Sequence, residues 1–197
     1  MGSIRYNLIM EPNKYKIDNE LLKQFIEGES EAFDAIVHRH HTAVYRLAYK
    51  FTRNRSDAED VAQDTFLRAY EFLKRNPKSL KLKPWLMTIC VNLCRNLAKK
   101  KKSFNFSDLK RTDEDTDFLD RVEDKKAGPD KQAKVKQTQA RVQRAMELLP
   151  PKYQIVLQLR FNEDMSYQEI ADTLRIPMNT VKVHINRAKS KLKTELT

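Results

Sequence analysis

The chain has 197 residues, of which 33% are charged and only 3 are glycine and 7 proline, and its 38 Lys+Arg against 27 Asp+Glu give a formal net charge of +11. So few turn-forming residues argue against an all-β fold, and the length allows one domain or two small ones. A protein this basic typically binds a polyanion, nucleic acid ahead of an anionic membrane, with a merely solvated basic surface as the alternative.

Residues 1–17 precede the first helical pattern and are predicted to form an N-terminal leader. They lack the apolar core of a signal peptide, and no apolar run in the chain approaches the roughly 20 residues needed to span a bilayer. We therefore expect a cytoplasmic protein.

Residues 18–102 are predicted to form a first small helical domain, because apolar residues recur there at helical spacing. Gly28 interrupts two early helices, and a later helix begins at Pro84, a residue favoured in a first helical turn. Cys90 and Cys94 lie four residues apart without further suitably spaced ligands, so they are predicted to be small core residues. No metal or cofactor is expected.

Residues 57–73 are predicted to form a helix with one apolar side and an unusual outer side. That outer side is acidic and carries an exposed leucine: Asp60, Gln63, Asp64, Leu67 and Glu71. Such a surface favours a basic or mixed protein partner. A solvated helix surface is the alternative.

Residues 74–102 contain ten basic residues and no acidic one. Within them a polar stripe repeats at helical spacing: Thr88, Asn92, Arg95 and Lys99. This combination suits a nucleic-acid strand, with its backbone on the charges and its base edges on the amides. The alternative is a solvated helix end whose positive charge suits the helix dipole.

Residues 103–131 are predicted to be a flexible acidic linker, because residues 112–124 carry seven acidic side chains against one basic. Residues 132–197 are predicted to form a second small helical domain. The fold class is therefore all-α: two small helical domains joined by a flexible linker, the second with a helix-turn-helix.

The helix-turn-helix is predicted from local signals near the C-terminus. Ser166 and Glu169 fit a capping box, residues 175–177 end that helix, and another helix starts near Asn179 and Thr180. In this motif the second helix enters the DNA major groove. A helical hairpin with a basic surface is the alternative.

Three segments in this order resemble the extracytoplasmic-function (ECF) group of sigma-70 factors. Residues 57–70 resemble their polymerase-binding segment, residues 85–93 their promoter-melting helix, and residues 148–192 their −35-binding domain. The resemblance implies a non-enzymatic factor that binds core RNA polymerase and directs promoter-specific initiation. Such a factor recognises the −35 and −10 elements and melts the −10 region.

The resemblance, together with the basic stretch, assigns candidate residues to three surfaces. The polymerase-binding set docks on the β′ clamp helices: Asp60, Gln63, Asp64 and Leu67. In the −10 set, Asn92 lies beside a flipped base and the loop of residues 76–83 forms its pocket: Arg68, Asn76, Lys78, Lys81, Lys83, Thr88, Asn92 and Arg95. The −35 set lies on the last helix: Thr180, Lys182, His184, Asn186, Arg187 and Lys189.

The expected partners are core RNA polymerase, through its β′ clamp helices and β subunit, promoter DNA, and a membrane-associated anti-sigma factor, with no small-molecule substrate. Leu80 and Leu82 stand where the family commonly has aromatic residues, so the sequence does not define the promoter. Two alternatives remain at this point. One is a helix-turn-helix regulator that is not a polymerase subunit, and the other is a helical adaptor that binds only protein.

Overall fold

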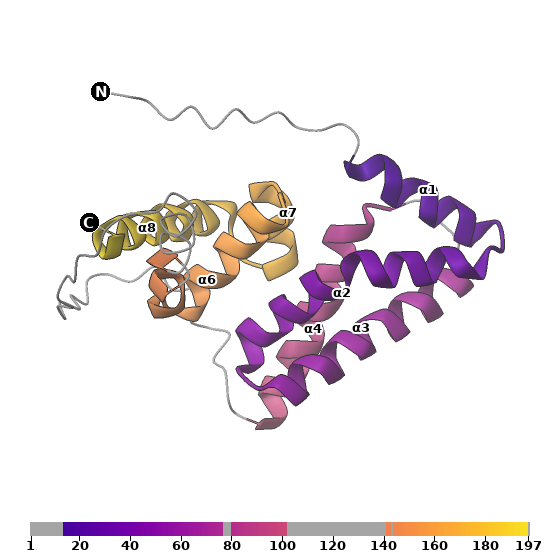
Figure 1. Cartoon of the computed structure of the whole chain (residues 1–197), viewed down its shortest axis with the longest axis horizontal. Helices are drawn as coiled ribbons and strands as arrows, with labels where there is room; N and C mark the ends of the chain where they lie inside the picture. Colours follow the sequence, from indigo (N-terminus) through magenta and orange to yellow (C-terminus); the bar gives the residue numbers. More distant parts are fainter. Residues whose placement is uncertain (1–13, 77–79, 102–140, 143, 197) are drawn as a thin grey trace, which may run out of the picture.

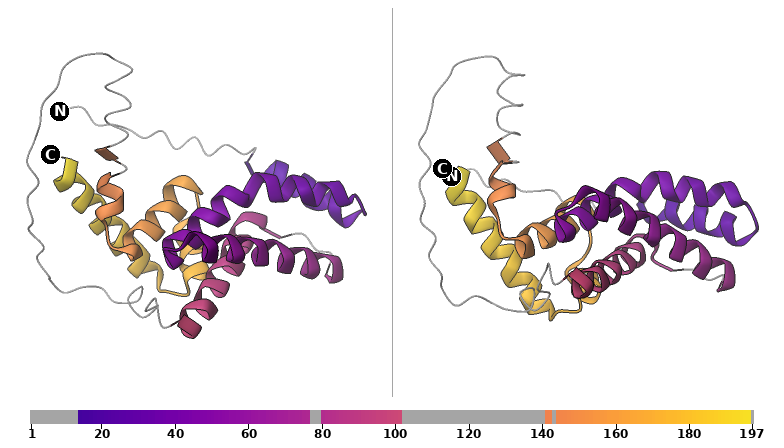
Figure 2. Two further views of the ribbon diagram at one scale, coloured as in Figure 1. Left: turned by 60° about the horizontal axis from the view of Figure 1, so that its bottom comes forward. Right: turned by 90° about the horizontal axis from the view of Figure 1, so that it is seen from below.

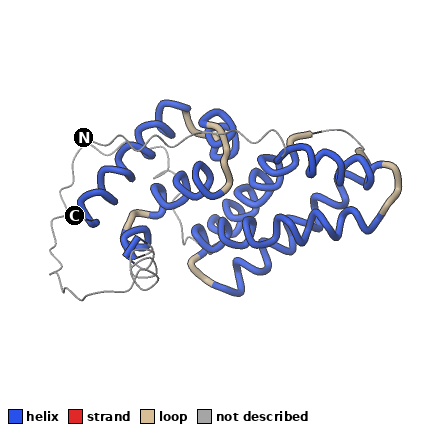
Figure 3. The backbone as a smooth tube through the Cα atoms, turned by 45° about the horizontal axis from the view of Figure 1, so that its top comes forward, coloured by secondary structure: helices blue, strands red, loops and turns tan. Residues whose placement is uncertain are grey.

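The computed structural model describes residues 14–76, 80–101, 141–142 and 144–196, and within these ranges all regular structure is helical (Figure 3). The predicted all-α chain of two small helical domains, the second with a helix-turn-helix, is confirmed. The predicted linker, residues 103–131, lies outside the described residues.

The first domain consists of four helices that lie side by side (Figure 1): α1 (Lys14–Ile26), α2 (Ser30–Thr52), α3 (Arg55–Arg75) and α4 (Leu82–Lys101). The predicted break at Gly28 is confirmed, because this glycine has a φ of 106°, which other residues rarely adopt. α3 begins where the Asn54 side chain accepts a hydrogen bond from the backbone N–H of Asp57 (3.0 Å). α1 begins at Lys14, four residues before the predicted domain start, and α4 begins at Leu82, two residues before Pro84.

The centre of this domain is apolar, and the prediction that the two cysteines are small core residues is confirmed. Cys90 and Cys94 are free thiols and are buried. The hydrogen bond with Cys94 and burial raise the pKa of the Cys90 thiol well above its usual range, so this thiol stays protonated. Both residues act as small apolar side chains.

The second domain contains a short helical stretch (residues 144–148), α6 (Pro151–Leu157), the π-helical turn η2 (Gln158–Asn162), α7 (Tyr167–Leu174) and α8 (Met178–Leu196). The predicted capping box is confirmed: Ser166 Oγ accepts from the Glu169 N–H (3.2 Å), and Glu169 Oε2 accepts from the Ser166 N–H (2.9 Å). Arg175 ends α7 in the left-handed region, with φ 48°. α8 follows after the three-residue turn 175–177 and completes the helix-turn-helix.

The two domains are in contact, which the sequence analysis did not predict. α7 lies against α4 and α6 lies against α2, as both views in Figure 2 show. One cluster of buried apolar residues includes Val44 and Met87 of the first domain and Ile155 and Ile170 of the second. The described helices of the two domains therefore share a continuous apolar core.

Candidate nucleic-acid interface

The outer side of α3 presents the residues that its helical spacing predicts. Asp60, Gln63 and Asp64 are exposed, and Leu67 has 57% of its surface accessible to solvent. They are exposed because Val61, Thr65 and other residues on the opposite side of α3 are buried in the core. α3 thus offers carboxylates around an exposed leucine.

A groove of about 460 Å³ runs between α3 and α4. Asp60 and Asp64 line it from α3, and Lys99 and Lys100 line it from α4. Arg68 also lines this groove. The lining does not include Thr88, Asn92 or Arg95, so the structure divides the predicted −10 set between two surfaces. Asn96, which was not among the predicted residues, also lines the groove.

Three predicted −10 residues of α4 are partly buried: Thr88, Asn92 and Arg95. Asn92 Oδ1 accepts a hydrogen bond from Arg95 Nη1 (3.4 Å), and Thr88 Oγ1 donates to the backbone carbonyl of Pro84 (2.8 Å). Asn76 is exposed at the end of α3, where its side-chain amide donates to the Phe72 carbonyl (3.3 Å). Lys78 lies outside the described residues.

The second domain contacts four predicted −10 residues. Lys81 Nζ lies 2.8 Å from Glu169 Oε1, and Lys83 Nζ lies 2.9 Å from Glu163 Oε2. The hydroxyl oxygens of Thr88 and Thr173 are 3.1 Å apart. Arg95 donates from Nη2 to the backbone carbonyl of Leu174 at the end of α7. One side of α4 is therefore in contact with the first helix of the helix-turn-helix.

The charged groups at this contact differ in their surroundings. Lys83 and Glu163 side chains are only 13% and 6% exposed, whereas Lys81 is 71% exposed. Burial raises the pKa of Glu169, but hydrogen bonds from Lys81 and Ser166 outweigh it, so the pKa lies below its ordinary value. Burial lowers the pKa of Arg95, and the like charge of Arg175 lowers it further.

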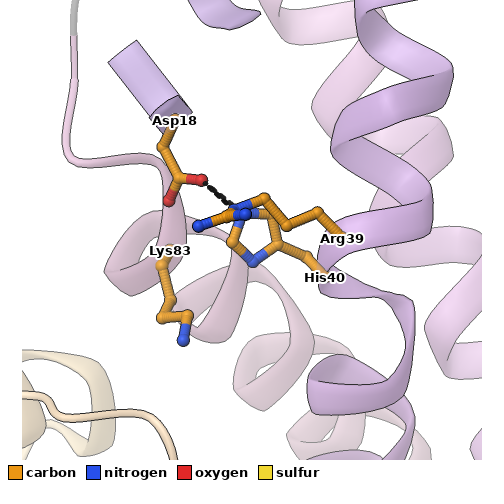
Figure 4. A pocket seen from close by; sticks show the side chains of 4 residues that line it. All are labelled: Asp18, Arg39, His40 and Lys83. Carbon is orange, nitrogen blue, oxygen red and sulfur yellow. Dashed lines mark hydrogen bonds and ion pairs between the residues drawn. The ribbon is translucent and has the colours of Figure 1, made fainter. Parts of the chain in front are cut away.

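A small pocket of about 190 Å³ at the same side of the first domain is lined by Asp18, Arg39, His40 and Lys83 (Figure 4). Asp18 Oδ1 accepts hydrogen bonds from Arg39 Nε (2.8 Å) and from His40 Nε2 (3.0 Å). Burial raises the pKa of Asp18, but the hydrogen bond and charge of His40 and the charge of Arg39 outweigh it, so the pKa is lowered. The other ring nitrogen of His40, Nδ1, is buried and has no hydrogen-bond partner.

This Asp18 cluster was not predicted, although one signal for it is present in the sequence. His40 lies at helical spacing between Ile36 and Val44, which are both fully buried. A histidine in an apolar stripe requires a polar partner, and Asp18 from α1 is that partner.

α8 exposes part of the predicted −35 set and buries the rest. Lys182, Asn186 and Lys189 are exposed, and Arg187 is partly buried. Lys189 Nζ lies 5.1 Å from the centre of the Phe161 ring.

Two predicted −35 residues require correction, because Thr180 and His184 are buried, with 8% and 0% of their surfaces exposed. His184 packs edge-on against Tyr153, with 5.6 Å between the ring centres. Position 184 lies three residues after the buried Val181 and four before the buried Ala188, so the helix repeat turns it inward. In this structure neither side chain lies on the outer surface of α8 from which DNA bases can be reached.

No helix among the described residues is both long enough and apolar enough to cross a membrane. No group of three or more histidine, cysteine, aspartate or glutamate side chains there could hold a metal ion.

Comparison with known proteins identifies the family. Residues 36–104 match the family model described as Sigma-70 region 2, and residues 139–192 match Sigma-70, region 4. The ECF RNA polymerase sigma factor SigW of Bacillus subtilis (strain 168) is 31% identical over 177 residues, covering 89% of this chain and 94% of SigW.

Two solved structures resemble this one, each with a TM-score of 0.56. CnrH, solved in complex with the cytosolic domain of CnrY, is 26% identical, and the match covers 90% of this chain and 96% of CnrH. The sigma factor RpoE from Bartonella quintana, solved with the anti-sigma factor NepR, is 20% identical, and the match covers 83% of this chain and 96% of RpoE. This second likeness shows that the fold is shared.

Sequence, fold and helix-turn-helix therefore agree, and the chain belongs to the sigma-70 family, within its ECF group of RNA polymerase sigma factors. Its function is therefore that of a transcription initiation factor. The family matches favour this function over that of a helix-turn-helix regulator that is not a polymerase subunit.

Proposed function

We propose that α4 and the residues before it contact and melt the −10 element, that α8 binds the −35 element, and that the outer side of α3 holds core RNA polymerase. In these terms, residues 18–102 act as sigma domain 2, residues 132–197 act as sigma domain 4, and residues 103–131 join them. The protein acts in the cytoplasm and has no catalytic step of its own. The observation that supports this division is the opposite charge of two neighbouring helical surfaces: the exposed residues among 60–64 of α3 carry two carboxylates and no cation, whereas α4 has no acidic residue.

Promoter melting requires groups that stabilise an unstacked base and an open strand. The Asn92 amide can both donate to and accept from a base edge, and Lys81, Lys83 and Arg95 supply positive charge on the same helix or just before it. Extrusion of a base costs a few kcal/mol, which pocket contacts and contacts between the cations and the strand offset. Arg68, which lines the separate groove between α3 and α4, and Asn76, at the end of α3, are proposed to add contacts to the −10 element. Lys78 belongs to the same proposal but lies outside the described residues.

The −35 element is proposed to bind the exposed side of α8. Lys182, Asn186 and Lys189 project there, and Arg187 lies at its edge. Lysine and arginine contact phosphates or guanine edges, and an asparagine amide matches an adenine edge. These side chains suit a helix that lies in the major groove.

Protein partners are proposed for the remaining surfaces. Asp60, Gln63, Asp64 and Leu67 dock on the β′ clamp helices, and the second domain contacts the β subunit. CnrH was solved in complex with the cytosolic domain of CnrY, and RpoE with the anti-sigma factor NepR. On this likeness we include a membrane-associated anti-sigma factor among the partners.

The role of Asn92 can be tested by comparing duplex and pre-melted promoters. Asn92→Ala should reduce open-complex formation on duplex templates by about tenfold, and less on pre-melted templates, because the amide contributes to capture of the unstacked base. The matched control is Asn19→Ala, which removes an exposed amide on α1, outside the assigned surfaces, and should have little effect. Equal loss on both templates would contradict a role for Asn92 in melting.

A further inference from the structure

The side of α4 assigned to the −10 element is occupied by the second domain. We infer that in the free protein the second domain masks this side of α4, with Glu163 and Glu169 taking the positions on Lys83 and Lys81 that DNA phosphates occupy in the open complex. The inference rests on the proposed function of α4 and describes how its access to DNA is controlled.

The chemistry of the two pairs supports this exchange. A carboxylate and a phosphodiester both present anionic oxygens, and a lysine ammonium binds either one as a compact positive charge. Lys81 and Lys83 are 2.8 Å and 2.9 Å from their carboxylate partners, which are distances of charge-assisted hydrogen bonds. A nucleic-acid strand can therefore replace the second domain by exchanging one anion for another.

Steric exclusion adds to the charge argument. The contacts on α4 run from Lys81 to Arg95, which spans about 21 Å of helix at 1.5 Å per residue. The Lys83 side chain, paired with Glu163, has only 13% of its surface exposed. Asn92 is partly buried, and its side-chain oxygen accepts a hydrogen bond from Arg95. A strand cannot reach Lys83 unless the two domains separate.

Lys83 lines the pocket shown in Figure 4, and it is the cation there that can exchange its carboxylate partner for a phosphate. Asp18 lies in the same pocket but already accepts from Arg39 and His40. The carboxylate of the second domain is the partner that Lys83 loses when the domains part, and its positive charge is then available to a phosphate.

The two DNA-binding surfaces differ in this closed form. Lys182, Asn186 and Lys189 of α8 remain exposed while the −10 side of α4 is covered. Only molecules in which the domains have separated can bind single-stranded DNA, so the apparent affinity for a single strand falls in proportion to the open fraction. Duplex binding through α8 does not depend on this fraction.

The first test neutralises the two masking carboxylates. In the variant Glu163→Gln with Glu169→Gln, glutamine keeps the side-chain volume, and at position 169 its oxygen can still accept in the capping box. Fluorescence anisotropy with a mixed-sequence single-stranded DNA of about 12 nucleotides should show about tenfold tighter binding than the wild type. The matched control is Glu20→Gln with Glu71→Gln, which makes the same change in net charge at exposed positions and should alter binding less than about twofold.

The second test locks the closed form. The Thr88 and Thr173 oxygens are 3.1 Å apart, so Thr88→Cys with Thr173→Cys should form a disulfide, while Cys90 and Cys94 are buried and remain reduced. The oxidised variant should lose binding to the same oligonucleotide, and reduction should restore it.

The possible results separate the inference from the proposed function. If the disulfide does not form, or if oxidised and reduced proteins bind the single strand equally well, the masking inference is overturned and α4 can still be the DNA-binding helix. If neither the reduced form nor the glutamine variant binds while the disulfide forms readily, the proposed −10 role of α4 is wrong, and the masking inference fails with it.

Discussion

Asp18 is a buried carboxylate that joins α1 to α2 through Arg39 and His40. A buried charge of this kind stabilises the fold only while its partners hold it, and removal of one partner leaves the others without compensation. The sequence marked Asp18 as the start of a domain, but the structure makes it an internal link between two helices.

Replacement of this carboxylate should destabilise the protein. Asp18→Asn is expected to lower the free energy of unfolding at neutral pH by about 3 kcal/mol, measured by urea denaturation. The control Asp34→Asn changes an exposed aspartate of α2 and should alter the free energy by less than about 0.5 kcal/mol.

The pH dependence of this effect has a definite sign. Because the pKa of Asp18 in the folded protein lies below its ordinary value, its contribution is present at neutral pH and is lost as the pH falls through the lowered value. The difference between wild type and Asp18→Asn should therefore shrink as the pH is lowered below the ordinary carboxyl range. A difference that is unchanged or larger in acid would contradict the ion-pair account.

At the scale of single elements, α8 shows how one helix separates folding from recognition. His184 is fully buried against Tyr153, whereas Lys182, two residues earlier, is exposed. The family resemblance placed both on the DNA side, but the helix repeat brings position 184 into line with the buried Val181 and Ala188.

The two residues should therefore respond differently to substitution. His184→Ala should lower the free energy of unfolding by about 1–3 kcal/mol, while Lys182→Ala should change it by less than about 0.5 kcal/mol. Lys182→Ala should weaken duplex binding and, if Lys182 contacts a phosphate, reduce the salt dependence by about one unit. Unchanged DNA affinity and salt dependence in Lys182→Ala would remove α8 as the recognition helix.

α3 is the second element with a separable role. Asp60→Lys with Asp64→Lys should abolish binding to core RNA polymerase, because like charges at an interface cost several kcal/mol. Circular dichroism should remain helical, since both residues are exposed. The control Glu20→Lys with Glu195→Lys makes the same change in net charge elsewhere, and normal affinity in the α3 variant would refute the assignment.

Local sequence signals predicted most of the individual elements. The capping box of Ser166 and Glu169, the break at Gly28 and the start of a helix near Asn179 depend on neighbours within a few positions, where spacing determines the outcome. Contacts between distant segments were not predictable in this way. Lys81 and Glu169 are 88 residues apart, and nothing in the spacing of either segment indicates that they meet.

At the scale of the whole molecule, those long-range contacts change how the sites are interpreted. The sequence indicated two separate DNA-binding domains, but the structure joins them through one apolar core and the pairs Lys81–Glu169 and Lys83–Glu163. Glu163 and Glu169 were missed as functional residues because each has an ordinary local context, beside a helix end and in a capping box. Their contribution comes from the residues they meet on the other domain.

Run-off transcription with purified core RNA polymerase tests the central claim most directly. Core enzyme alone and this protein alone should give no discrete product from duplex templates with randomised upstream sequence. Together they should give run-off products from a subset of templates that share a −35 and a −10 element at fixed spacing, and Asp60→Lys with Asp64→Lys should abolish these products. Absence of discrete products with the wild-type protein, or binding to the same templates without any effect on core polymerase, would contradict the account.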